Sequence, residues 1–297
     1  MTRHLVIGAS GQVGEHLLAC LETRGERVFG TCYQHTEADL YPLDIRNAQA
    51  VDELLRQLRP DVVYLPAALT NVDYCEIHPD LTYETNVLGA CNVVCMANGI
   101  DAKLVYFSSD YVFDGINGPY SEGDPANPIC EYGRHKLLSE HYIALHARHY
   151  LIVRTTVVYG WESQRKNFVV RLADRLRKGE RVQVPVDQVG SPTYAPNLAE
   201  AVAELIDLDV QGLFHVVGPQ LATRYDFAVA AARAFGLDSD LLVPISTSEL
   251  NQAAARPLRA GMTVGKAQAL LKARLIDCVE GLSAMASEQG KRGEDDC

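Results

Sequence analysis

The chain has 297 residues, 47% of them hydrophobic, and its formal net charge is −11. This charge argues against a nucleic-acid-binding surface, which needs clustered Lys and Arg, and no apolar run approaches the roughly 20 residues that cross a bilayer. The eight cysteines show no paired metal-ligand spacing, so we expect them to be reduced and to bind no metal. Together these features predict a cytoplasmic protein that binds neither a membrane nor nucleic acid.

In the first half of the chain, short apolar runs alternate with longer stretches of helical periodicity. Strands are expected at His4–Ile7, Arg27–Thr31, Asp61–Leu65, Lys103–Phe107 and Leu151–Val153. Helices are expected between them at Val13–Thr23, Ala48–Leu58, Leu81–Ala97 and Tyr132–His146. Apolar strands separated by helices predict a parallel sheet that is covered on both faces. The fold class is therefore α/β, with the doubly wound (Rossmann) sheet that binds nucleotides.

After Gly160 the alternation loosens, and three further helices are expected at Phe168–Lys178, Asn197–Ile206 and Tyr225–Ala234. We expect residues 1–160 to form mainly the dinucleotide-binding domain, and residues 161–286 to form mainly a smaller C-terminal substrate-binding lobe. Leu213–Val217 has the pattern of a strand that rejoins the main sheet. Residues 287–297 are polar and charged, and we expect them to be a disordered tail.

A glycine-rich run, Gly8-Ala9-Ser10-Gly11-Gln12-Val13-Gly14, directly follows the first expected strand. Gly8 permits a tight turn, Gly11 lets the backbone approach a pyrophosphate, and Gly14 lets the helix pack against the strand. The amides at the start of the helix then face the phosphates. This run predicts a dinucleotide cofactor, with contacts from Gly8, Ser10, Gly11, Gln12 and Val13.

The end of the second expected strand lacks the Asp or Glu that would hold the ribose hydroxyls of NAD. Neutral residues, among them Tyr33, stand there instead and leave room for a 2′-phosphate. This favours NADP(H) over NAD(H), with use of both as the alternative, and His35 or Arg24 is the candidate to neutralise the phosphate. Asp44 and Ile45 follow in the chain, where we expect the Asp44 carboxylate to meet the adenine.

Tyr132 and Lys136 stand four residues apart at the start of an expected helix, so their side chains share a face and can converge on one ligand. A free Tyr titrates near about 10, and we expect the Lys cation and an oxidised nicotinamide to lower the pKa of Tyr132. The same spacing also occurs by chance on amphipathic helices. Ser109 favours a catalytic pair over chance spacing, because it ends a strand at the edge where parallel sheets bind ligands and can stabilise charge on a carbonyl oxygen.

These motifs resemble those of the extended short-chain dehydrogenase/reductases, and within them the dTDP-4-dehydrorhamnose reductase family. The most specific segments are Ser109–Gly115 and Tyr132–Lys136, with further matches at Ala67–Asp73, Asn86, Arg154–Gly160 and Asp187–Tyr194. The resemblance implies that Ser109, Tyr132 and Lys136 form the catalytic triad. It also implies cofactor contacts from Ala67 and Ala68. The substrate contacts that it implies are Thr70, Val72, Tyr111, Val157, Asn167 and Arg256, the last two lying towards a nucleotide diphosphate.

The resemblance implies NADPH-dependent reduction of the C4 ketone of a nucleotide-linked 4-keto-6-deoxysugar, with Tyr132 as the proton donor. Many rhamnose-forming members have Trp where Val157 stands here, although Trp161 lies four residues further on. This departure leaves a different ketosugar or nucleotide open. Two other functions also stay open. One is a nucleotide-sugar epimerase or dehydratase, and the other is a non-catalytic regulatory subunit similar to that of methionine adenosyltransferase. A homodimer through two of the expected helices, Leu81–Ala97 and Tyr132–His146, is left open against a monomer.

Overall fold

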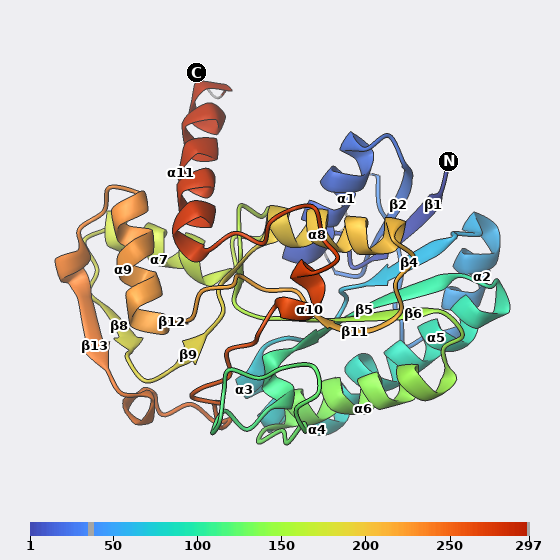
Figure 1. The fold of residues 1–297 in the computed structure, drawn as a ribbon, viewed down its shortest axis with the longest axis horizontal. Helices are drawn as coiled ribbons and strands as arrows, with labels where there is room; N and C mark the ends of the chain where they lie inside the picture. The colour runs from blue at the N-terminus through green and yellow to red at the C-terminus, as the bar shows by residue number, and fades with distance from the viewer. Residues whose placement is uncertain (35–38, 296–297) are drawn as a thin grey trace.

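The computed structural model describes residues 1–34 and 39–295, and a parallel sheet of seven strands forms its centre (Figure 1). The strand order is β11-β6-β5-β4-β1-β2-β3. The strands are β1 (Arg3–Ile7), β2 (Arg27–Cys32), β3 (Tyr41–Pro42), β4 (Val62–Leu65), β5 (Lys103–Ser109), β6 (Tyr150–Thr155) and β11 (Gly212–His215). The chain winds outward from β1 in both directions, so the predicted doubly wound fold is confirmed. The switch between β1 and β4 marks the carboxyl edge where such sheets bind ligands.

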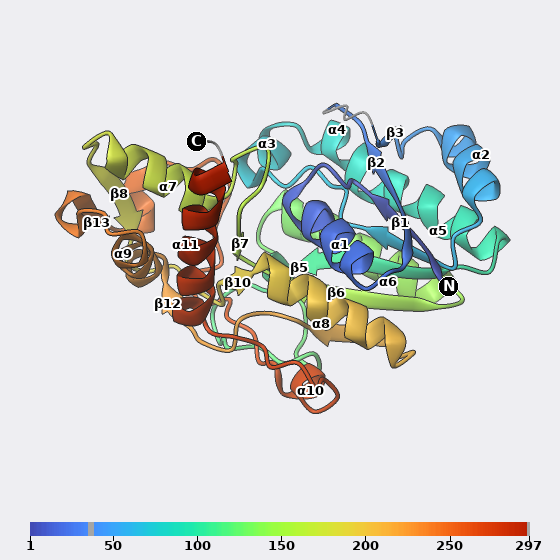
Figure 2. The same ribbon diagram turned by 90° about the horizontal axis from the view of Figure 1, so that it is seen from above.

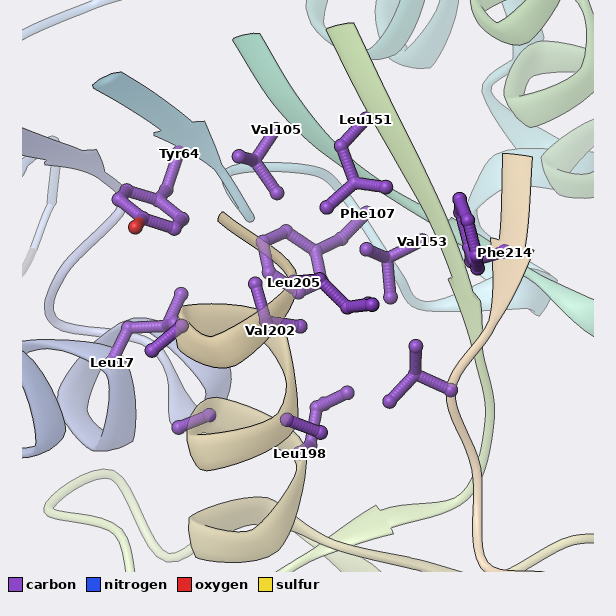
Figure 3. Close-up of a cluster of buried hydrophobic side chains, with 14 of the residues drawn as sticks. Leu17, Tyr64, Val105, Phe107, Leu151, Val153, Leu198, Val202, Leu205 and Phe214 are labelled. Carbon is purple, nitrogen blue, oxygen red and sulfur yellow. The ribbon is translucent and has the colours of Figure 1, made fainter. Parts of the chain in front are cut away.

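Helices cover both faces of this sheet (Figure 2). One face is packed by α1 (Gln12–Thr23) and α8 (Ala195–Asp207), and the other by α2 (Ala48–Leu58), α5 (Gly89–Gly99) and α6 (Glu131–His146). Figure 3 shows the first of these interfaces, where side chains of β4, β5, β6 and β11 meet those of α1 and α8. All four residues of β4 are buried, because successive side chains on a strand point to opposite faces and both faces are covered.

The expected helix over Leu81–Ala97 is not continuous. After α3 (Val72–Ile77), the chain forms α4 (Pro79–Tyr83), then a π-helical turn over Glu84–Leu88, and only then α5. Buried Asn86 lies in this turn, where its side chain accepts from Leu69 N at 2.7 Å and donates to Leu69 O at 2.9 Å. The turn therefore fixes the loop that follows β4, and π-helical turns often occur near functional sites.

The later part of the chain forms a lobe beside the sheet, with its own buried cluster that runs from Tyr159 to Met285. Its helices are α7 (Phe168–Arg177), α9 (Arg224–Ala234) and α11 (Cys278–Asp295), and α10 (Gly265–Gln268) lies against β11. Short strand pairs complete it: β7 (Val158–Tyr159) with β10 (Thr193–Tyr194), β8 (Val182–Pro185) with β13 (Leu242–Ile245), and β9 (Val189–Gly190) with β12 (Ala222–Thr223). Within the stretch expected to rejoin the main sheet, β11 pairs in parallel with β6.

The expected disordered tail is wrong for residues 287–295, because α11 continues to Asp295. Leu282 and Met285 anchor the helix in the lobe core. Beyond them, Tyr194 Oη donates to Glu288 Oε1 at 2.5 Å, and Arg177 Nη2 donates to Gln289 Oε1 at 3.0 Å. Packing and these bonds outweigh the polar composition of the segment. Residues 296 and 297 lie outside the described part of the chain, within which no helix is long and apolar enough to span a membrane.

Candidate active site

The glycine turn between β1 and α1 is shaped by close backbone contacts. Gly8 has φ +95°, and a Cβ there would lie 2.9 Å from Ala67. A Cβ on Gly14 would lie 2.2 Å from the Gly8 carbonyl oxygen, so only glycine lets α1 pack this closely on the turn. Gly11 caps α1 without a side chain, and the amides of the first turn, around Gln12 and Val13, face the carboxyl edge of the sheet. Such a helix start is suited to an anionic group.

Gly14→Ala is expected to lower the free energy of unfolding by about 1–3 kcal/mol, the usual cost of forcing a methyl into a packed site. Gly99→Ala is the matched control, because a Cβ at Gly99 meets nothing within 4 Å. Urea denaturation of both variants checks the difference. Equal midpoints for the two variants would contradict the tight packing described for Gly14.

An arginine that the sequence reading missed lies at the ends of β2 and β3. Arg46 Nη2 donates to Asp44 Oδ2 at 2.7 Å and to Tyr33 Oη at 2.8 Å. These hydrogen bonds from Arg46 lower the pKa of the Asp44 carboxyl, so the carboxylate is already paired with a cation. Ile45 is buried, and its carbonyl accepts from Asn92 Nδ2 at 2.9 Å, which fixes the loop that carries Asp44.

Arg24 is wrong as a candidate for binding the 2′-phosphate. It ends α1, a helix of 12 residues, so it stands ~18 Å from the glycine turn along the helix axis. There it forms an ion pair with Asp207 of α8. His35, the other candidate, lies outside the described residues.

The predicted triad comes together between β5 and α6. Ser109 ends β5, and Tyr132 and Lys136 lie on the first turns of α6, all three side chains being buried. Lys136 Nζ donates to Phe107 O at 2.8 Å and lies 5.9 Å from the centre of the Tyr132 ring. Gly133 makes this approach possible, since a Cβ there would lie 2.1 Å from the Tyr111 carbonyl oxygen.

Burial controls the protonation of this site. It raises the pKa of Tyr132 well above 10, with neighbouring Tyr106 and Asp110 adding to the effect. It lowers the pKa of Lys136 to about 8, opposed by Glu140. In the protein alone, desolvation outweighs the lowering of the Tyr132 pKa expected from the Lys136 charge, so the net shift of the Tyr132 pKa is upward. Tyr132 keeps its proton at neutral pH and is suited to donate it.

A pocket opens next to Ser109, between the sheet and the lobe. Residues from both sides line it, among them Asp110, Tyr111, Thr156, Val157, Arg224 and Arg256. The rings of Tyr111 and Tyr132 meet edge to face at 5.6 Å, which connects the pocket to the triad. Arg256 is held by Asp73 Oδ2 at 2.8 Å and by the Ala254 carbonyl at 2.9 Å.

Comparison with known proteins agrees with this geometry. A family model described as the RmlD substrate binding domain matches residues 2–290. The chain belongs to this family.

Relatives match the RmlD-family chain over nearly its whole length. dTDP-4-dehydrorhamnose reductase from Escherichia coli K12 is 31% identical over 296 residues, covering 96% of this chain and 97% of its own. The structure of dTDP-4-dehydrorhamnose reductase from Bacillus anthracis in complex with NADP has a TM-score of 0.89 and 30% identity, covering 97% and 99%. Methionine adenosyltransferase 2 subunit beta from Bos taurus is 30% identical over 275 residues, covering 90% and 82%. The predicted membership of this family of NAD(P)-dependent oxidoreductases is confirmed.

The remaining substrate residues implied by the RmlD family divide into two groups. Val157 lines the pocket, and Val72 packs with Tyr111 and Tyr132. Thr70 is exposed in the loop after β4 and is not part of the pocket wall formed by the described residues. Asn167 is not there either, because its amide donates to Gly160 O at 2.8 Å and its carbonyl oxygen caps α7. The structure gives Asn167 the role of a helix cap.

Val157 lines the pocket at the position where many rhamnose-forming members of the family have Trp. Trp161 does not replace the missing ring of rhamnose-forming relatives, since it is buried in the lobe core and donates to Met285 O at 2.8 Å. Val157 also has φ +46°, in the left-handed region that is costly for a β-branched residue. Such strained residues persist mostly at functional sites, which agrees with a position on the pocket wall.

Arg224 and Asp110 also line the pocket, although neither was among the substrate residues predicted from the sequence. Arg224 is the first residue of α9, after the cap Thr223. A cation is unfavourable at the start of a helix, where the macrodipole is positive. An arginine directly after a Thr helix cap is therefore the feature of the sequence that could have indicated a role for Arg224 outside helix stability.

Proposed function

We propose that this chain is an NADP(H)-dependent reductase that acts on the C4 ketone of a nucleotide-linked 4-keto-6-deoxysugar. The observation that carries the proposal is the buried set of Ser109, Tyr132 and Lys136, which faces the carboxyl edge of the sheet near the glycine turn. The pocket beside it, lined by Tyr111 and Arg256, supports a substrate that has both a ring and an anionic part. The family relatives named as dTDP-4-dehydrorhamnose reductases support the same class of substrate.

The choice of NADP(H) is supported by the end of β2. Cys32, Tyr33 and Gln34 offer no carboxylate to the ribose hydroxyls, and Asp44 is paired with Arg46. The Bacillus anthracis relative was crystallised with NADP. The glycine turn and the loop with Ala67 and Ala68 would hold the dinucleotide, which supplies the hydride when bound.

The side chains of the chain perform the rest of the reaction. Tyr132 Oη holds the proton that the ketone oxygen takes up as the hydride arrives at C4, so the ketone becomes a hydroxyl. Ser109 Oγ donates to Asp110 Oδ1 at 2.9 Å in the protein alone and turns this proton towards the ketone oxygen when substrate is present. Both donors stabilise the charge that develops on that oxygen. Lys136 places a positive charge beside Tyr132, which favours loss of the phenol proton during transfer.

Oxidation of NADPH, followed by absorbance, tests the proposal against dTDP-, GDP- and UDP-linked 4-keto-6-deoxysugars. We expect one of them to consume NADPH in equal amount to the alcohol formed. An epimerase or dehydratase would convert substrate without net consumption of NADPH. A non-catalytic regulatory subunit would show no turnover at all. Absence of reduction across the panel, while dinucleotide still binds, would exclude the reductase.

The rate of ketone reduction is expected to fall as the pH rises through about 8, where buried Lys136 loses its charge. The sign follows because the charged amine assists proton loss from Tyr132 and the neutral amine does not. Single-turnover rates between neutral and alkaline pH measure the effect. In Lys136→Arg, whose guanidinium stays charged, the alkaline loss is expected to disappear, although the rate itself is lower. An unchanged alkaline limb in this variant would assign the titration to another group.

A further inference from the structure

The loop between β7 and α7 reaches from the lobe to the glycine turn. We call its residues 162–166 the strap. Gln164 Nε2 donates to Ser10 O in the turn at 2.5 Å. Ser163 donates to the Glu15 carboxylate, from its backbone N at 3.0 Å and from Oγ at 2.5 Å. Ser10 precedes the first amides of α1 and Glu15 follows them. The tip of the strap therefore crosses the helix start that is suited to an anionic group.

The base of the strap is fixed in the lobe. Glu162 is 7% exposed, and its Oε1 accepts from the backbone N of Lys166 and from that of Asn167, each at 2.5 Å. These bonds close the strap into a compact loop. Arg165 Nη2 donates to Asp174 of α7 at 2.7 Å, which ties the outer side of the loop to the same helix that Asn167 caps. The base is therefore part of the lobe.

The tip of the strap has the properties of a segment that can open. Ser163 is exposed and Gln164 is half-buried, so their bonds to the turn and to α1 lie close to water and each contributes little to stability. Lys166 Nζ donates to Gln164 Oε1 at 2.5 Å, which orients the amide towards the turn. Arg165 has φ +51°, in the left-handed region that is unfavourable for residues with a side chain. Strained residues of this kind cluster at ligand clamps and switch regions.

The segment before the strap is packed tightly and limits the opening to the tip. Val157 lines the substrate pocket, and Gly160 follows it a few residues before the strap. A Cβ on Gly160 would lie 2.9 Å from His16 Nε2 of α1 and 3.3 Å from Ala195 Cβ of α8. This segment is therefore held against both helices. Movement of the tip leaves the pocket wall at Val157 in place.

We propose that the strap is a latch over the bound dinucleotide and that its opening limits the exchange of NADP(H). The tip crosses a dinucleotide whose pyrophosphate occupies the start of α1, so the bonds of Ser163 and Gln164 break before the dinucleotide leaves. An element of the lobe then controls release, although the glycine turn holds the phosphates. Opening of such elements sets the turnover of many enzymes. The inference requires a bound dinucleotide but no particular ketone, so it goes beyond the proposed function.

Stopped-flow fluorescence of NADPH measures the association and dissociation rate constants that test the latch. In the double variant Ser163→Ala/Gln164→Ala, we expect both rate constants to rise by about 10-fold, the factor for loss of two hydrogen bonds near water. The Kd, which is their ratio, is expected to change little, because a latch slows entry and exit alike. Gln49→Ala is the matched control, since Gln49 is an exposed glutamine of α2 that bonds to Glu53 at 2.8 Å. Its rate constants are expected to equal those of the wild-type protein.

Hydrogen exchange of the strap amides provides a readout that does not depend on fluorescence. We expect exchange at residues 163–165 to be faster in the double variant, and slower in the wild-type protein after NADP⁺ is added. Thermal unfolding verifies folding, and Gln164→Asn, with a shorter amide side chain, carries the same expectation with a smaller factor if the double variant does not fold.

The pattern of rate constants distinguishes a latch from other roles of the strap. A rise in the dissociation rate constant alone would make the strap a static contact of the dinucleotide and overturn the latch. Unchanged rate constants in a folded variant would also overturn it. If the wild-type protein binds no NADPH, the cofactor of the proposed function fails and the latch fails with it. Absence of ketone reduction in a protein with the expected NADPH exchange would refute only the proposed function.

Discussion

Replacement of Tyr132 by Phe is expected to lower the rate of ketone reduction by about 10²–10⁴-fold, the usual contribution of a positioned proton donor. The substitution removes only the hydroxyl. The ring keeps its edge-to-face contact with Tyr111 and its place beside the Lys136 ammonium, so the loss arises in the proton transfer. In the proposed reaction Ser109 only donates a hydrogen bond to the ketone oxygen, and Lys136 Nζ donates to Phe107 O, so neither neighbour replaces the missing proton donor.

Single-turnover oxidation of bound NADPH is the measurement for this variant, with the Kd of NADPH as a second readout that is expected to stay unchanged. Tyr142→Phe is the matched control, since Tyr142 lies on the same helix and its hydroxyl lies 3.4 Å from Cys95 Sγ, away from the triad. A Tyr132→Phe protein that turns over at the wild-type rate would remove Tyr132 from the role of proton donor. A parallel loss in Tyr142→Phe would show that the effect is one of helix stability.

A second large effect is expected from Glu140→Gln, which should lower the free energy of unfolding by about 3–5 kcal/mol, the usual result of breaking a buried ion pair. The Glu140 carboxylate accepts hydrogen bonds from Arg154 Nε at 2.9 Å and from Arg154 Nη2 at 2.6 Å, and each side chain is 5% exposed. The variant keeps the volume of the side chain and leaves the Arg154 cation without a counter-charge. Two other neighbours of Arg154, Phe113 and His215, supply no negative charge. Burial keeps His215 neutral by lowering its pKa to about 4.

Urea denaturation measures this effect, and Asp52→Asn provides the contrast. Asp52 pairs with Arg56 on the exposed face of α2 at 2.8 Å, where solvent screens the charges and loss of the pair changes stability little. A Glu140→Gln protein as stable as Asp52→Asn would mean that water reaches the Arg154 pair in solution. Because Glu140 also raises the pKa of Lys136, the alkaline limit of the reaction is expected to move to lower pH in the same variant.

The parts of this molecule that follow from the sequence are those with a short-range signal. Continuous apolar runs locate β1, β4 and β5, because a strand buried on both faces needs an apolar side chain at every position. The spacing of Tyr132 and Lys136 places both on one helix face. The approach of Gly14 to the Gly8 carbonyl is equally local, since it lies within one turn and one helix, whereas the approach of Gly8 to Ala67 joins the turn to the loop after β4.

The parts that do not follow depend on contacts between distant segments. The bond of Arg24 to Asp207 joins α1 to α8, and no local pattern shows that this guanidinium is already engaged at the far end of α1. Helix α11 extends past Ser287 because Tyr194 and Arg177 reach it from elsewhere in the lobe. Arg224 and Asp110 line one pocket only because the lobe folds back over the end of β5. The sequence shows which of these side chains are charged or polar, but the residues that they contact depend on the tertiary structure.

The left-handed backbone of Val157 has a consequence for how easily the pocket can change. Strain at a β-branched residue is relieved by glycine and reduced by an unbranched side chain. Most replacements of this valine would therefore ease the backbone at the same moment that they reshape the wall beside the sugar. Substitution at this position is therefore expected to cost less folding stability than substitution at a core residue with relaxed backbone geometry. In the proposed reductase, substitution of this one residue can therefore change the range of sugars that the pocket accepts, while Tyr132 and Lys136 stay in place.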